Sequence, residues 1–144
     1  MHERHTSLPE HRAAFRLDGS GGSVSTARGC AREYLEQCVP PLAQSVAEDA
    51  LVVVSELVTN AVSHAPGPYC LYLVEDEGEL TIAVSDESIV APGPRTPDLG
   101  GSGGFGWHIL RRVARRVDVY IRPPWGKTVS ATLKLLVLAS PIAA

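Results

Sequence analysis

The sequence predicts a single α/β domain in which helices cover one face of a mixed, mostly antiparallel sheet. Three observations predict it: a long amphipathic helix at residues 49–65, alternating strands at 69–75 and 79–86, and a second group of strands near the carboxyl end. The chain has 144 residues, of which 44% are hydrophobic and 20% are charged, as is usual for one soluble domain.

The helix at residues 49–65 has a wide apolar surface formed by Ala50, Leu51, Val54, Leu57, Val58, Ala61 and Val62. A narrow polar stripe runs along it and contains Asp49, Glu56, Asn60 and Ser63. Glu56 and Asn60 are four residues apart and therefore share a face. A carboxylate beside a carboxamide can serve as a base and as an oxygen ligand for Mg²⁺. The solvated edge of an amphipathic helix is the alternative explanation.

The chain before this helix contains a tail, a short strand and a first helix. Residues 1–12 are polar and include a proline, which predicts a disordered tail. A strand is predicted at 13–17, and a glycine-rich turn follows it, where Ser23 or Ser25 could cap a helix at 25–38. The residues of this helix that we expect to be buried are Ala27, Ala31, Tyr34, Leu35 and Cys38.

The segments at 69–75 and 79–86 are joined by a short turn that contains a glycine, which predicts a β-hairpin. After this hairpin, residues 87–106 form a long loop that is rich in proline and glycine. Loops of such length in compact domains are usually functional lids or disordered segments.

A helix is predicted at residues 105–117, strands at 118–122 and 128–137, and a loose tail at 138–144. One face of the helix is apolar, and the other carries Arg111, Arg112, Arg115 and Arg116. This basic face could dock an acidic partner, although an ordinary solvated face is the simpler explanation.

Composition narrows the functional class. The net charge of −3 gives no general attraction to nucleic acid or to anionic membranes, and no apolar run is long enough to cross a bilayer. Cys30 and Cys38 are expected on one helix with a rise of roughly 12 Å between them, beyond disulfide reach. The third cysteine, Cys70, has no partner left. Unpaired cysteines without a signal peptide predict a reducing, cytoplasmic location.

Three further features suggest a site for a phosphorylated ligand. Asp86 ends a predicted strand, where its carboxylate could accept a hydrogen bond from an amine such as that of adenine; a turn residue is the alternative. The glycine-rich segment before residue 106 runs directly into a helix, whose amino terminus can bind phosphate. At the start of the last strand, the run 126–128 offers backbone amides and the hydroxyl of Thr128.

These motifs together resemble the GHKL ATPase superfamily. The segment SELVTNAVSHA is similar to its N-box, and a strand ending in Asp86, the run GGFGWHIL and the run GKTVSATL follow in the family's order. The resemblance is closest to the small anti-sigma-factor kinases of the RsbW-like type. It implies a Bergerat-type two-layer α/β sandwich over residues 13–137, which holds ATP between the helices and a glycine-rich lid.

The resemblance also implies roles for individual residues. Asn60 would be the magnesium ligand, Glu56 would orient or activate the attacking hydroxyl, and Asp86 would read adenine. The cofactors would be ATP and Mg²⁺, with Asn60, His64, Ala65, Asp86, Gly103, Gly104, Phe105, Gly106, Trp107 and Thr128 at the nucleotide.

A serine/threonine kinase of this type would sequester a sigma factor and phosphorylate a STAS-domain anti-anti-sigma partner. It would not contact nucleic acid or membrane directly, and it could form a homodimer. Two departures keep an alternative open. Residues 86–90 lack the glycines of the first glycine box, and residues 101–103 lack an arginine that active kinases often carry before the lid. A nucleotide-binding module that regulates by sequestration alone is the alternative.

Overall fold

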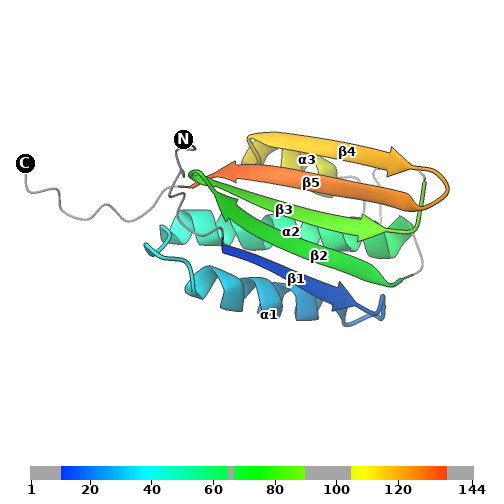
Figure 1. The fold of residues 1–144 in the computed structure, drawn as a ribbon, viewed down its shortest axis with the longest axis horizontal. Helices are drawn as coiled ribbons and strands as arrows, with labels where there is room; N and C mark the ends of the chain where they lie inside the picture. The colour runs from blue at the N-terminus through cyan, green and yellow to red at the C-terminus, as the bar shows by residue number, and fades with distance from the viewer. Residues whose placement is uncertain (1–10, 65–66, 90–104, 136–144) are drawn as a thin grey trace, which may run out of the picture.

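The computed structural model describes residues 11–64, 67–89 and 105–135 (Figure 1). Its elements are, in chain order, β1 (His11–Leu17), α1 (Ser23–Glu36), α2 (Gln44–His64), β2 (Tyr69–Asp76), β3 (Glu79–Asp86), α3 (Phe105–Val113), β4 (Arg116–Arg122) and β5 (Gly126–Lys134). Residues 1–10 of the expected amino-terminal tail, the expected tail at 138–144 and most of the loop at 87–106 lie outside these ranges. Residues 11 and 12, expected in the tail, instead begin β1 and pair with β2.

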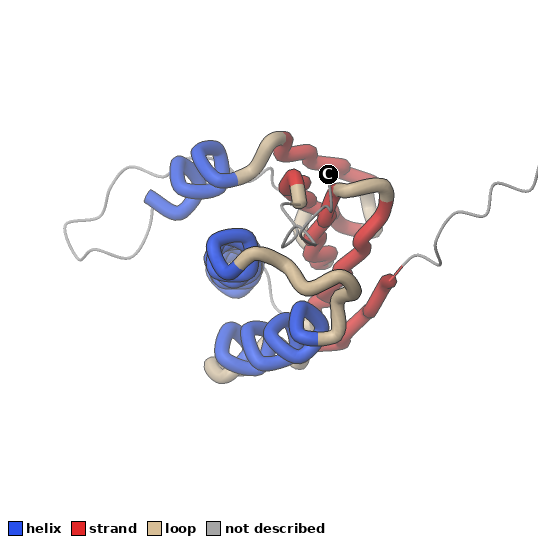
Figure 2. The backbone as a smooth tube through the Cα atoms, turned by 90° about the vertical axis from the view of Figure 1, so that its left-hand side faces the viewer, coloured by secondary structure: helices blue, strands red, loops and turns tan. Residues whose placement is uncertain are grey.

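The sheet has five strands in the order β1-β2-β3-β5-β4, and every neighbouring pair is antiparallel. The helices lie together on one side of it, so the domain has two layers (Figure 2). This confirms the predicted α/β architecture with one covered face. None of the helices in the described ranges is long and apolar enough to cross a membrane.

The core lies between the sheet and α2. In β3 burial alternates strictly, and Leu80, Ile82 and Val84 face the helices with no more than 1% of their surface exposed. The helix residues that meet this face, almost all fully buried, are Ala50, Val53, Val54, Leu57, Val58 and Ala61. The opposite face of the sheet carries the intervening residues of each strand and has no helix over it in the described structure.

Two helices begin earlier than the sequence predicts. α2 starts at Gln44 rather than residue 49, because Val46 is buried and extends the apolar stripe by one turn. α1 starts at Ser23 and ends at Glu36, two residues early at each end. Gly22 occupies the cap position and no side chain caps the helix, so the expected cap by Ser23 or Ser25 is wrong.

The predicted helix at 105–117 is wrong in its second half. α3 ends at Val113, and β4 begins at Arg116. The Arg115 amide donates to the Thr132 carbonyl at 2.8 Å, and Val117 pairs with Ala131, so the segment joins the sheet. The predicted basic helix face is therefore split between two elements.

Candidate functional site

The carboxyl-terminal half of α2, the end of β3 and the start of β5 lie at one end of the domain, on the right of Figure 1. The topology explains this arrangement. α2 ends at His64 and the chain re-enters the sheet at Tyr69, the first residue of β2. Cys70 of β2 pairs with Ser85, and β5 starts opposite the end of β3. Residues far apart in sequence thereby share one edge of the core.

Asn60 contributes an unsatisfied polar atom at this end of α2. Its side-chain Oδ1 is buried and has no hydrogen-bond partner within the part of the chain that the structure describes. A buried amide oxygen without a donor costs about 1–3 kcal/mol, so a bound cation or donor at this oxygen would recover free energy. Such an atom fits a ligand site better than a solvated helix edge.

Glu56 lies one helical turn before Asn60 and is only partly exposed. Burial raises the pKa of its carboxyl group above the ordinary glutamate value. A carboxylate in this environment is a stronger proton acceptor than one in water, which suits a general base.

Asp86 ends β3 on the face that packs against the helices, and its carboxylate is bound by Lys127. The Lys127 Nζ lies 3.0 Å from Oδ1 and 2.8 Å from Oδ2 of Asp86. The exposed fractions of the two side chains are only 2% for Asp86 and 1% for Lys127. The Ser88 amide also donates to Oδ1, at 2.7 Å. Asp86 is thus part of a buried ion pair.

Gly126 allows this pair to form. Its φ of +132° is a conformation that other residues rarely adopt, and a β-carbon there would collide with the Asp86 carbonyl oxygen. Asp86 and Lys127 are then direct cross-strand partners. Tyr69 lies close enough to this pair for the charge of Asp86 to affect it. Burial and, secondarily, that charge raise the pKa of the Tyr69 phenol.

The sequence interpretation did not single out the Lys127 side chain, and it placed Thr128 at the nucleotide. Side chains alternate along β5, so Lys127 lies on the helix-facing side with Val129, and Thr128 lies on the open side. The Thr128 hydroxyl is 2.7 Å from that of Ser85, which also faces away from the helices. Thr128 and Asp86 both line a pocket of about 180 Å³ at this end of the sheet, but the Thr128 hydroxyl is bonded to Ser85 on the side of the sheet that faces away from Asn60 and the helices.

The remaining predicted residues are only partly within the described structure. Trp107 is half-buried in α3 and packs against the core, with the Arg111 guanidinium 5.5 Å from its ring centroid. Phe105 and Gly106 form the first turn of α3. The residues and side chains outside the described structure are Ala65, Gly103, Gly104 and the side chains of His64 and Phe105.

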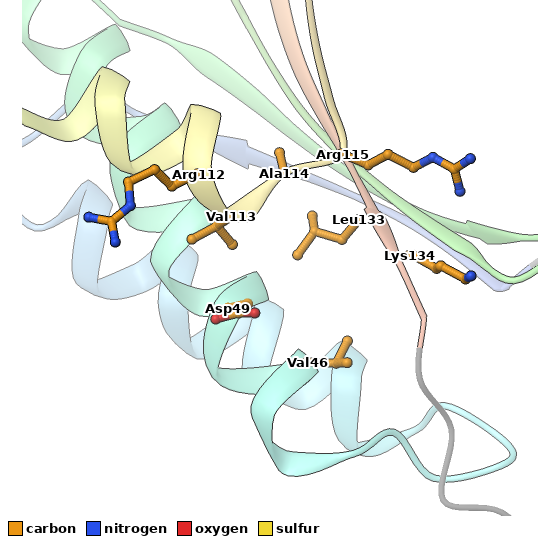
Figure 3. A pocket seen from close by; sticks show the side chains of 8 residues that line it. All are labelled: Val46, Asp49, Arg112, Val113, Ala114, Arg115, Leu133 and Lys134. Atoms are coloured by element: carbon orange, nitrogen blue, oxygen red, sulfur yellow. The ribbon is translucent and has the colours of Figure 1, made fainter.

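Asp49 does not join the Glu56 and Asn60 pair. It lines a pocket of about 450 Å³ at the other end of α2, between that helix, the end of α3 and β5 (Figure 3). Arg112 and Arg115 extend from this pocket in opposite directions, while Val113 points into it. The cations around Asp49 therefore do not converge on a common ligand position.

The donor set suits a hard cation only in part. Within the described ranges, no three His, Cys, Asp or Glu residues come together as a metal site. Magnesium usually keeps several waters and takes few protein ligands besides substrate phosphates, so one amide oxygen such as that of Asn60 is compatible with it. The Asn60 end of the site is thus compatible with Mg²⁺, whereas the carboxylate of Asp86 is already bound by Lys127.

Comparison with known proteins agrees with this architecture. Residues 20–133 match the family described as histidine kinase-like ATPase domain. The structure is similar to that of the RsbU and RsbW domains of Rv1364c from Mycobacterium tuberculosis, with a TM-score of 0.67 and 18% sequence identity. That match covers 86% of this chain and 32% of the other, so this chain spans about a third of its length. No curated protein matches the sequence.

Proposed function

Because the chain belongs to the histidine kinase-like ATPase domain family, we propose that it is an ATP-dependent regulator of the anti-sigma type. Its nucleotide would bind at the end of the domain where α2, β3 and β5 meet, with Mg²⁺ on Asn60. The observation that carries this proposal is the buried, unpartnered Oδ1 of Asn60, one turn from Glu56 on the same helix face.

The reaction that we propose is transfer of the γ-phosphoryl group to a serine or threonine hydroxyl of a partner. The hydroxyl oxygen bonds to the γ-phosphorus, the bond from that phosphorus to the β–γ bridging oxygen breaks, ADP leaves, and Glu56 accepts the hydroxyl proton. Such transfer depends mainly on positioning and charge neutralisation. The raised pKa of Glu56 supports its role as the proton acceptor.

The partners that we propose are a STAS-domain anti-anti-sigma protein as the phosphate acceptor and a sigma factor as the sequestered target. An RsbW domain in the similar structure and the family resemblance of the N-box support this assignment. At 18% identity the structural likeness concerns the fold, so the resemblance of the N-box is the main support for these partners.

Calorimetric titration with ATP, with and without Mg²⁺, tests the nucleotide site. We expect Asn60→Ala to lose the Mg²⁺-dependent part of the affinity, because the amide oxygen is removed. Ser63→Ala is the matched control, since Ser63 is an exposed polar residue one turn along the same helix. An Asn60→Ala variant that keeps its magnesium dependence would overturn the ligand assignment.

Glu56→Ala tests transfer separately from binding. We expect ATP affinity to stay close to wild type and phosphorylation of a STAS partner to disappear. Equal loss of binding and transfer would contradict the proposed role of Glu56.

A second function, sequestration of a partner without phosphoryl transfer, is favoured by one observation. The carboxylate that would read adenine is occupied by Lys127. A protein that binds its partner equally well without nucleotide, and shows no ATP binding at millimolar concentration, would support this second function over the first.

A further inference from the structure

The carboxylate of Asp86 accepts three hydrogen bonds from its own chain. Oδ1 accepts from the Lys127 ammonium at 3.0 Å and from the Ser88 amide at 2.7 Å, and Oδ2 accepts from the ammonium at 2.8 Å. All three bonds are charge-assisted, because the acceptor is an ionised carboxylate, and the two from Lys127 also have a charged donor; such bonds are about twice as strong as neutral ones. Little hydrogen-bonding capacity is left for a ligand.

An amine from a base could reach Asp86 only by displacing this ammonium. The exchange replaces two bonds from a charged ammonium by one from a neutral amine, and it leaves a lysine charge in a site where 1% of its side chain is exposed. The backbone cannot open the pair easily, because β5 is hydrogen-bonded to β3 on one side and to β4 on the other. The ion pair therefore competes with any adenine at this position.

We propose that Lys127 lowers the affinity of this chain for adenine, because its ammonium group occupies the Asp86 carboxylate that would otherwise accept a hydrogen bond from the base. This inference rests on the proposed nucleotide function. Lys127 acts as a specificity-determining residue: while it holds Asp86, a nucleotide is bound mainly through its phosphates, at the Asn60 end of the site. The wild-type protein should consequently distinguish ATP from GTP only weakly.

The test compares wild type with Lys127→Thr, Asp86→Asn and the double variant, using calorimetric titration with ATP, GTP and inorganic tripolyphosphate in Mg²⁺. We expect Lys127→Thr to raise ATP affinity by at least about tenfold, because the freed carboxylate can accept from the adenine amine. Affinity for GTP and tripolyphosphate should stay within about threefold, since neither ligand presents that amine to Asp86.

Asp86→Asn gives the complementary result. In the wild-type background it should change ATP affinity by less than about threefold, because the carboxylate is not used for the base. In the Lys127→Thr background it should remove the whole gain. This non-additivity separates a base-reading carboxylate from one that only supports the fold.

Lys127→Gln is a second variant for the case in which Lys127→Thr does not fold. Glutamine can still donate a hydrogen bond to Asp86 after the charge is lost. We expect its ATP affinity to lie between those of wild type and Lys127→Thr. A fall in ATP affinity in Lys127→Gln or Lys127→Thr would overturn the inference and assign Lys127 to direct contact with the nucleotide. Loss of ATP binding in Asp86→Asn alone would overturn it as well.

Failure of the two proposals gives different results. If wild type binds tripolyphosphate in a Mg²⁺-dependent way but no Lys127 variant gains ATP affinity, only the inference about Lys127 is wrong. If neither wild type nor any variant binds tripolyphosphate or a nucleotide, both the inference and the proposed function are wrong.

Discussion

The carbonyl oxygen of Asp86 lies only 2.0 Å from the position that a β-carbon on Gly126 would take. Gly126 also has a φ of +132°, so both its backbone conformation and its surroundings exclude a side chain. This contact brings the start of β5 against the end of β3 and sets Lys127 opposite Asp86. The geometry of the buried ion pair therefore depends on a glycine next to it in sequence.

Gly126→Ala should lower the free energy of unfolding by about 2–4 kcal/mol, through backbone strain and the collision with the Asp86 carbonyl. Urea denaturation measures this change. Gly29→Ala is the matched control, because Gly29 lies exposed within α1 and nothing would meet its β-carbon. The control should gain about 0.5–1 kcal/mol from the removal of a glycine inside a helix. Equal effects of the two substitutions would contradict the packing argument.

Apolar periodicity predicted which elements exist but not all of their ends. The segment around Arg116 satisfies two periods, because Val113 and Val117 have helical spacing while Val117 and Val119 alternate as in a strand. Pairing of Val117 with Ala131 decided the outcome, and this long-range contact is not visible in the local sequence.

The sequence indicated the relative placement of the candidate residues where local helix geometry sets it, but not where strand register sets it. Glu56 and Asn60 share a face through helical spacing alone. In β5, either Lys127 or Thr128 can face the core, depending on the register of the strand. Because Lys127 pairs with Asp86, it is Lys127 that faces the core, and a shift of one residue would reverse this. Lysines are almost never buried without a partner, so composition gave no reason to place Lys127 inside.

Glu56 should make stability depend on pH. Burial raises its pKa in the folded protein, so the folded state holds this proton at pH values where the unfolded chain has lost it. The contribution of Glu56 to the free energy of unfolding is therefore greatest at pH values below the ordinary glutamate pKa. It falls as the pH rises toward the pKa of Glu56 in the folded protein. Glu56→Gln should be more stable than wild type at neutral pH, with the difference shrinking as pH is lowered through that window.

Chemical denaturation of both proteins at several pH values checks this expectation. Glu33→Gln, which changes an exposed carboxylate on α1, serves as the control and should follow the wild-type curve. A Glu56→Gln curve parallel to wild type at every pH would show that Glu56 keeps an ordinary environment.

The three cysteines should differ in reactivity. Cys38 is 3% exposed, and burial, together with Glu75, raises the pKa of its thiol to about 12. Roughly one molecule in ten thousand would then carry the reactive thiolate at pH 8. Titration of the native protein with a thiol reagent should modify the half-buried Cys30 and Cys70 first, and Cys38 only after denaturation. Rapid native labelling of Cys38, located by mass spectrometry, would contradict this prediction.

The turn between β2 and β3 contains a correctable strain. Asp76 pairs with Glu79, so Glu77 and Gly78 form a two-residue hairpin loop, and both have positive φ, at 50° and 77°. This is the pattern of a type I′ turn, in which asparagine is favoured before glycine and glutamate is not. Glu77→Asn should therefore raise the free energy of unfolding by about 1 kcal/mol. Glu79→Asn makes the same change two residues later, within β3, where asparagine is disfavoured and no gain is expected. Comparing the two variants by urea denaturation isolates the backbone effect, and a similar gain in both would trace it to the lost charge instead.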